Sequence, residues 1–168
     1  MPITIRPVTA DDWREMKRIR LLALATDRMA FGAALEQEHA FADQVWIDRA
    51  RASALGRDVT TWVAEDDDAH RMVGMMGAHV GADGARLFGA WVDPAARGAG
   101  IGGRLLDAVL GWVAAVAPGA VVKLCVNPAF AAAVRLYQSR GFTRVGCSSG
   151  LQHAADVSTD EMVLSPAR

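Results

Sequence analysis

The sequence contains 168 residues, 52% of them hydrophobic, which suits one globular domain spanning residues 1–168 with a sizeable core. Its formal net charge of −1 gives no reason to expect a nucleic acid as partner. The sequence also lacks a run of about eighteen apolar residues and a charged-then-apolar leader, so we expect a soluble, cytoplasmic protein that does not bind a membrane.

The first half of the chain predicts a strand, two helices and a β-hairpin. The strand covers residues 3–8. Thr9 and Asp12 form a variant of the capping box, so we expect a helix to begin there and to end before Asp27. The following elements are a loop over 31–39, a helix over 45–54 that ends at Gly56, and strands over 59–65 and 72–80 that flank an acidic turn.

The second half predicts strands that alternate with helices. An apolar run at 87–92 predicts a buried strand, and apolar residues at helical spacing predict a helix from Ile101 to Val116. Because this helix joins the 87–92 strand to another at 121–126, the two strands should be parallel. The chain then predicts a helix over 129–140, closed by Gly141, and two last strands over 142–147 and 159–164. One α/β domain with a mixed sheet accounts for this order.

The two cysteines, Cys125 and Cys147, are too few for a disulfide framework and have no metal-ligand spacing with the four histidines. We therefore expect buried free thiols and no metal site. The acidic run at 66–68 is interpreted as a solvated loop tip, because consecutive carboxylates do not converge on a cation.

Charge is distributed unevenly along the chain. Residues 1–68 carry nine Arg or Lys against thirteen Asp or Glu, whereas residues 69–155 carry eight against three. The basic half suits a polyanionic cofactor, and one hypothesis is that the acidic half favours a cationic substrate such as an amine. The alternative is that the acidic residues are solvated surface charges without a role.

The segment from Val92 to Arg104 is the strongest functional signal, because it joins a strand to a helix through a glycine-rich, basic loop. The first turn of a helix carries N–H groups without intrahelical acceptors and a partial positive charge, so several donors can hold an anion there. Glycine lets the backbone approach closely, and Arg97 and Arg104 add full charges. These residues predict a binding site for a pyrophosphate.

Two known patterns fit this loop. Gly98, Gly100 and Gly103 satisfy the dinucleotide pattern G-x-G-x-x-G, but that pattern needs an acidic residue about twenty positions later, where this chain has Lys123. The other pattern, Arg/Gln-x-x-Gly-x-Gly/Ala, is met by residues 97–102. Behind a Val-Asp-Pro strand end, it resembles the acetyl-CoA pyrophosphate loop of the GNAT superfamily of N-acetyltransferases. The resemblance therefore favours acetyl-CoA over NAD as the ligand.

A second stretch, residues 124–142, looks like the second GNAT signature, in which a strand is followed by Asn-x-x-Ala-x-x-Leu-Tyr-x-x-x-Gly-Phe. Its end matches at Ala133, Leu136, Tyr137, Gly141 and Phe142.

Two positions depart from this signature. Phe130 stands where the family usually has Asn, which leaves open whether Asn127 replaces that polar contact with the cofactor. Cys125 stands where some members, notably those that acetylate protein N-termini, place a Glu base. We interpret this cysteine as a core residue rather than a nucleophile.

The resemblance covers nearly all of the chain and implies a GNAT-like α/β (α+β) fold. Its mixed, mostly antiparallel sheet has a central parallel strand pair splayed for acetyl-CoA, with helices on both faces. The resemblance also implies that Tyr137 protonates the departing thiolate, and an ordinary pKa of about 10 keeps its hydroxyl protonated at neutral pH. Glu36 and Glu38 are expected in the loop that walls the acceptor site. The residues expected to bind the cofactor are Ala90, Trp91, Val92, Arg97, Gly98, Ala99, Gly100, Ile101, Gly102, Gly103, Arg104 and Asn127.

The resemblance implies an acetyl-CoA-dependent N-acetyltransferase, an acyltransferase in which the primary amine of a small molecule attacks the thioester directly in a ternary complex. The alternatives are acetylation of protein or peptide N-termini or of lysine side chains, and a CoA-binding module without catalysis. A homodimer is compatible with the resemblance, because dimers are common among relatives. The sequence does not identify the general base.

Overall fold

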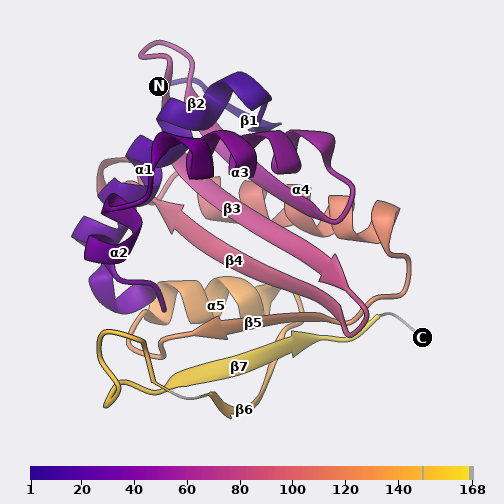
Figure 1. Ribbon diagram of the computed structural model, residues 1–168. Coiled ribbons are helices and arrows are strands. Elements are labelled where there is room, and N and C mark those ends of the chain that lie inside the picture. The colour runs from indigo at the N-terminus through magenta and orange to yellow at the C-terminus, as the bar shows by residue number, and fades with distance from the viewer. Residues whose placement is uncertain (149, 167–168) are drawn as a thin grey trace.

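The computed structural model describes residues 1–148 and 150–166. Within these residues the strands form one seven-stranded sheet in the order β1-β2-β3-β4-β5-β7-β6 (Figure 1). Neighbouring strands pair antiparallel except β4 and β5, which pair parallel, so the predicted mixed sheet is confirmed. The strands are β1 (Ile3–Pro7), β2 (Val59–Asp66), β3 (Arg71–Gly81), β4 (Gly84–Val92), β5 (Val122–Val126), β6 (Thr143–Ser148) and β7 (Thr159–Leu164).

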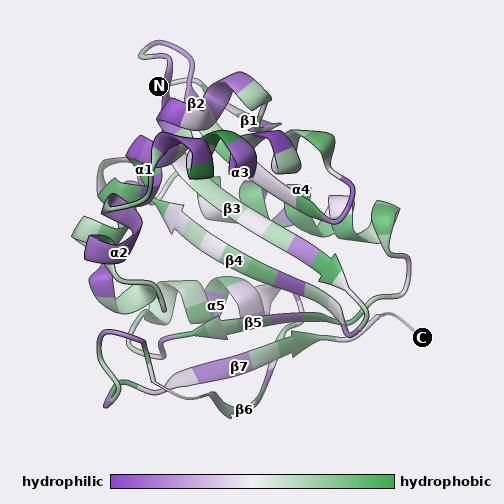
Figure 2. Ribbon diagram, viewed as in Figure 1, coloured by the Kyte–Doolittle hydropathy of each residue, from purple (hydrophilic) through white to green (hydrophobic). Residues whose placement is uncertain are grey.

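Helices cover both faces of the sheet, as expected (Figure 1). Successive residues of a strand point to opposite faces of the sheet, and both faces here are apolar. Met75 of β3 packs in a core cluster with α1, whereas its neighbour Met76 packs in a cluster with α4. Figure 2 shows hydrophobic residues along α4 and hydrophilic ones on the outward sides of α1 and α3. The helices are α1 (Trp13–Thr26), α2 (Leu35–His39), α3 (Asp43–Leu55), α4 (Ile101–Val116) and α5 (Ala131–Ser139).

The predicted helix boundaries agree with the structure at several ends. Helix α1 ends at Thr26, and α3 ends at Leu55 with Gly56 as its cap in the left-handed conformation, φ +59°. Helix α2 lies where the sequence predicted only a loop, because five residues are too few to show helical periodicity. None of the helices in the described ranges combines the length and apolar character that a membrane span needs.

The parallel contact between β4 and β5 is short. Within the described strands, Ala85 pairs with Val122 and Arg86 with Lys123, after which the two strands diverge (Figure 1). The segment 87–92 therefore has no strand partner on its β5 side, and its backbone polar groups there face an opening. The splayed central pair expected from the sequence is present.

A β-bulge reshapes β4 beside this opening. Gly89 and Ala90 together stand opposite Met76 of β3, because the register between the two strands shifts there. Gly89 adopts φ +63°, a conformation that other L-residues rarely adopt. The Phe88 ring lies over Gly77, where a Cβ would come within 2.3 Å of the ring.

The prediction of buried thiols is wrong, because Cys125 and Cys147 are both exposed. In β5, Leu124 and Val126 point into the core that α4 and α5 cover, so strand alternation places Cys125 on the opposite face. The helices on that face pack mainly against β2, β3 and β4, which leaves β5 uncovered there. Cys147 lies on β6, at the edge of the sheet.

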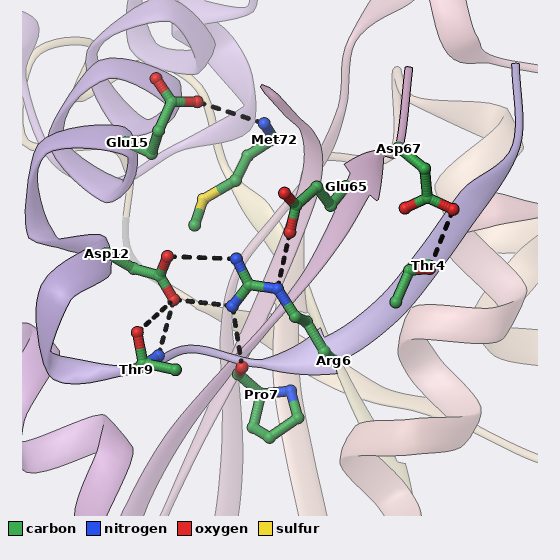
Figure 3. A network of polar contacts seen from close by, with 9 residues as sticks. All are labelled: Thr4, Arg6, Pro7, Thr9, Asp12, Glu15, Glu65, Asp67 and Met72. Carbon is green, nitrogen blue, oxygen red and sulfur yellow. Dashed lines mark hydrogen bonds and ion pairs between the residues drawn. The ribbon is translucent and has the colours of Figure 1, made fainter. Parts of the chain in front are cut away.

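An ion-pair network joins β1 to the start of the first helix and to β2 (Figure 3). The Arg6 guanidinium donates to Asp12 Oδ2 at 2.7 Å and to Glu65 Oε2 at 2.6 Å. Asp12 also accepts from the Thr9 backbone N–H and hydroxyl, which completes the predicted capping interaction. Burial alone would raise the pKa of Asp12, but the bonds from Arg6 and Thr9 outweigh burial and lower it.

Replacing Arg6 with Gln should destabilise the fold by about 2–3 kcal/mol at neutral pH, because two half-buried carboxylates lose their cation. Because the pKa of Asp12 is lowered in the fold, its stabilising contribution is present at neutral pH and is lost as the pH falls below about 4. The difference between the two proteins in urea unfolding should therefore shrink in acid. Arg135→Gln, on the exposed side of α5, is the matched control and should leave the unfolding free energy unchanged. Equal stability of wild type and Arg6→Gln at neutral pH would contradict the expected role.

Candidate active site

A cavity of about 560 Å³ lies between the diverging ends of β4 and β5. Its walls come from the segment 27–31 after α1, from β3, β4 and β5, from the loop 96–100, from the start of α4 and from α5. The predicted site residues that line it are Ala90, Trp91, Val92, Arg97, Gly98, Gly100, Ile101, Gly102, Gly103, Asn127 and Tyr137. Two distant signature segments, 90–103 and 127–137, are thereby brought together.

The cavity reaches both faces of the sheet. Leu105 and Tyr137 of its lining belong to the core cluster under α4 and α5. Phe31 and Trp91 of its lining belong to the core cluster under α1. A molecule entering from one face can therefore meet a molecule entering from the other inside the gap between the strands.

Residues 98–103 present a series of backbone N–H groups that have no acceptor among the described residues. The first hydrogen bond of α4 runs from the Arg104 N–H to the Gly100 carbonyl at 3.1 Å. Gly98 and Gly100 adopt φ +85° and +72°, and a Cβ on either would meet no atom within 4 Å. Glycine is therefore required here by backbone conformation rather than by space. Together with the positive end of α4, these donors can hold a diphosphate.

The two arginines of this loop lie in different places. Arg97 donates from Nε to the Val92 carbonyl at 2.9 Å and from Nη2 to Asp27 Oδ2 at 2.6 Å, and its side chain remains 47% exposed at the cavity. Arg104 instead points away and donates to the Ile3 carbonyl at 2.9 Å. The geometry gives no support to the expected contact of Arg104 with the cofactor, and Ala99 does not line the cavity either.

Tyr137 of α5 is one of the residues that line the cavity. The residue is 6% exposed, and its ring meets Phe142 edge-on with centroids 5.8 Å apart. The hydroxyl has no hydrogen-bond partner in the described part of the chain. Burial raises the pKa of Tyr137 to about 12, so the phenol stays protonated well above neutral pH. A protonated hydroxyl without a protein partner can donate a proton to a group bound in the cavity.

Residues 57–144, a little more than half of the chain, match the family model described as acetyltransferase (GNAT) domain. The chain belongs to the GNAT acetyltransferase family. Membership confirms the expected acyltransferase class and acetyl-CoA as the acyl donor of the family. None of the curated protein sequences compared with the chain matches it.

Solved structures share the GNAT fold over the whole chain at low identity. The acetyltransferase of the GNAT family from Streptococcus pneumoniae is 18% identical and superposes with a TM-score of 0.83, covering 99% of this chain and 100% of its own. The YncA protein of Salmonella typhimurium, solved with its cofactor acetyl-CoA, is 18% identical, with a TM-score of 0.80 over 100% of this chain and 96% of its own. A phosphinothricin acetyltransferase from Sinorhizobium meliloti, in complex with acetyl-CoA, is 20% identical, with a TM-score of 0.78 over 99% of this chain and 90% of its own.

Asn127 of this GNAT domain is engaged in protein contacts. Its Nδ2 donates to the Met29 carbonyl at 3.0 Å, and its Oδ1 accepts from the Ala129 N–H at 3.0 Å. These bonds tie the end of β5 to the segment after α1. Although Asn127 lines the cavity beside Phe130, the geometry does not support its side chain as a replacement for the polar cofactor contact of the family.

Glu36 and Glu38, expected at the acceptor site, do not line the cavity. Glu36 is exposed and pairs with Arg28 at 3.1 Å. Glu38 is buried under α1 and pairs with Arg20 and Arg49. Helix α2, which the sequence did not predict, turns both carboxylates toward these arginines and away from the opening. The expected role of the two glutamates in substrate binding therefore has no geometric support.

Asp27 lines the cavity and was not foreseen. Its Oδ2 accepts from Trp91 Nε1 at 2.7 Å as well as from Arg97. A buried indole N–H usually has an acceptor, so Trp91 carried a signal that a carboxylate or carbonyl would lie nearby. No sequence pattern singles out Asp27 as that acceptor, because it is 64 residues away from Trp91.

Proposed function

We propose that this GNAT protein transfers the acetyl group of acetyl-CoA to the primary amine of a small molecule, by direct attack in a ternary complex. The observation that carries the proposal is the cavity that reaches both faces of the sheet between β4 and β5. Free backbone donors at the start of α4 stand on one side, and the segment 27–31 stands on the other. Cofactor and amine can therefore bind at the same time.

The residues of the cavity fit acetyl-CoA. Residues 98–103 offer N–H groups to its diphosphate, and the unpaired edge of β4 at 87–92 offers backbone groups to its amide-containing arm and to an oxyanion. When bound, the cofactor supplies an activated acetyl thioester. Tyr137 holds a proton on its hydroxyl and can deliver it to the thiolate that leaves.

The acceptor side of the cavity supports a compact amine rather than a peptide. The 29–32 segment is tied to β5 by Asn127 and to the 150–158 segment by two further bonds: Gln152 N–H to the Gly32 carbonyl at 3.3 Å, and His153 Nε2 to the Phe31 carbonyl at 2.9 Å. These bonds hold the 29–32 segment in place beside the cavity, where an extended peptide would need an open groove.

Calorimetry with coenzyme A, followed by mass spectrometry of pooled small amines and pooled peptides incubated with acetyl-CoA, tests the proposal. We expect binding of coenzyme A and acetylation within the small-amine pool. Acetylation confined to peptides would replace the small-molecule acceptor with a protein one. Binding without transfer to either pool would favour a non-catalytic CoA-binding module, and absence of coenzyme A binding would refute the proposal.

A further inference from the structure

Within the described part of the chain, the guanidinium of Arg20 on α1 is hydrogen-bonded on one side only. Its Nε and Nη2 donate to the Glu38 carboxylate at 3.2 and 2.8 Å, and the side chain is 19% exposed. Its Nη1 has no acceptor among the described residues. Glu38 therefore holds two of the three guanidinium nitrogens, and the third can donate to a ligand.

The free nitrogen lies directly behind two residues that line the cavity, Gly89 and Phe31, although Arg20 itself is not part of the lining. Nη1 of Arg20 is 3.7 Å from the position that a Cβ on Gly89 would occupy, and it is the nearest atom there. The guanidinium carbon lies 4.8 Å over the Phe31 ring. Gly89 and Phe31 both line the cavity. Helix α1 packs across β3 and β4 (Figure 1), so Arg20 stands on the face opposite α4, where the diphosphate donors are.

The cluster around Arg20 keeps a net positive charge. Glu38 is 5% exposed and accepts from both Arg20 and Arg49, so one carboxylate faces two guanidiniums. Burial alone would raise the pKa of Glu38, but the two arginines outweigh it and lower the pKa, so the carboxylate is ionised at neutral pH. One positive charge therefore remains uncompensated.

Other charged groups near the opening do not cancel this charge. Asp27 is paired with Arg97. Arg86, whose Nη1 lies 3.5 Å from the cavity-lining Cys125, is paired with Glu161. The hypothesis that acidic residues of the first half attract a cationic acceptor is therefore not supported on this side of the cavity.

We infer that the acceptor is an amine that also carries a carboxylate, and that the free side of Arg20 binds this carboxylate beside Gly89. Arginine is matched to carboxylate oxygens, and a guanidinium already fixed by Glu38 loses little freedom on binding. Glu38 acts as the positioning residue. This inference rests on the proposed function and specifies its substrate class.

Matched acceptor pairs test the inference. Amino acids and the amides of the same amino acids, across several side chains, differ only in the carboxylate. We expect wild-type protein to prefer the acid over the amide in kcat/KM, and Arg20→Gln to lower kcat/KM for the acid by about tenfold or more while changing it little for the amide. Arg28→Gln removes the same charge from an exposed pair with Glu36 and should leave the preference intact.

A second readout does not depend on turnover. N-acetyl amino acids and N-acetyl amino acid amides, titrated into protein saturated with coenzyme A, should show the same acid preference, and Arg20→Gln should abolish it. The double variant Arg20→Gln/Glu38→Gln removes the unpaired buried carboxylate, so it reports on the subsite even if the single variant unfolds. Acetylation of amines with equal preference for acid and amide would overturn the carboxylate subsite and leave the proposed function standing. Failure to bind coenzyme A would instead remove the proposed function.

Discussion

Gly100→Asp should lower the affinity for coenzyme A by at least about a hundredfold. Gly100 precedes α4 with φ +72°, a conformation that Asp and Asn tolerate better than other non-glycine residues. An Asp carboxylate there would accept from the N–H groups of the first turn and would place a negative charge where the diphosphate is expected. Two like charges about 4 Å apart at an effective dielectric constant of about 20 repel by about 4 kcal/mol, which is enough for the loss.

Gly100→Asn distinguishes the effect of the added charge on coenzyme A affinity from the effect of the added side-chain volume. It has the same size and the same capacity to cap α4, but it adds no charge, so the affinity for coenzyme A should fall by less than about tenfold. Calorimetry on the two variants measures the difference directly. Equal affinities of Gly100→Asp and Gly100→Asn would place the diphosphate elsewhere.

A control in the same helix checks that the effect is local. Gly111 is exposed in the middle of α4, and a Cβ there would meet nothing within 4 Å. Gly111→Ala should therefore leave coenzyme A binding unchanged while raising the unfolding free energy by about 1 kcal/mol.

The sequence could predict the central strand-loop-helix segment because local rules act there together. Apolar residues recur at helical spacing from Ile101 to Val116, and the glycines before them have the positive φ that a tight helix start requires. The helical connection through α4 also predicted the parallel pairing of β4 with β5, since a crossover helix of this kind typically joins parallel strands. The boundaries of α4 and β5 matched within one residue, whereas β4 begins at Gly84, three residues before the predicted strand.

The side-chain partners within the site could not be predicted, because they come from distant parts of the chain. Arg104 reaches the Ile3 carbonyl across 101 residues, and Asn127 reaches the Met29 carbonyl across 98. Spacing rules predict which residues share a face, but they do not say which charge finds which partner. Cys125 shows the same limit: its strand was predicted, but not which of its faces the helices leave open.

Tyr137→Phe should lower kcat by about a hundredfold, the effect typical of a lost general acid, with the affinity for coenzyme A changed less than about twofold. Coenzyme A affinity should change little because the hydroxyl makes no hydrogen bond to the described residues. The phenyl ring of the variant can keep the edge contact that Tyr137 makes with Phe142. Single-turnover acetylation and calorimetry measure the two quantities separately. Full activity of Tyr137→Phe would show that another group protonates the thiolate.

Titration of Tyr137 tests the same assignment without substrate. It is the only tyrosine of the chain, so the ultraviolet signal of tyrosinate reports on it alone. Burial raises its pKa to about 12, so the native protein should ionise about two pH units above a free tyrosine. The raised value means that the folded state holds this proton more tightly than the unfolded state. The associated stability is present below pH about 10 and is lost, up to about 3 kcal/mol, as the pH rises toward 12, and Tyr137→Phe should remove this loss. An ionisation midpoint near 10 would instead mean that the hydroxyl faces bulk water, and a solvated phenol would compete poorly with water as the acid for the thiolate.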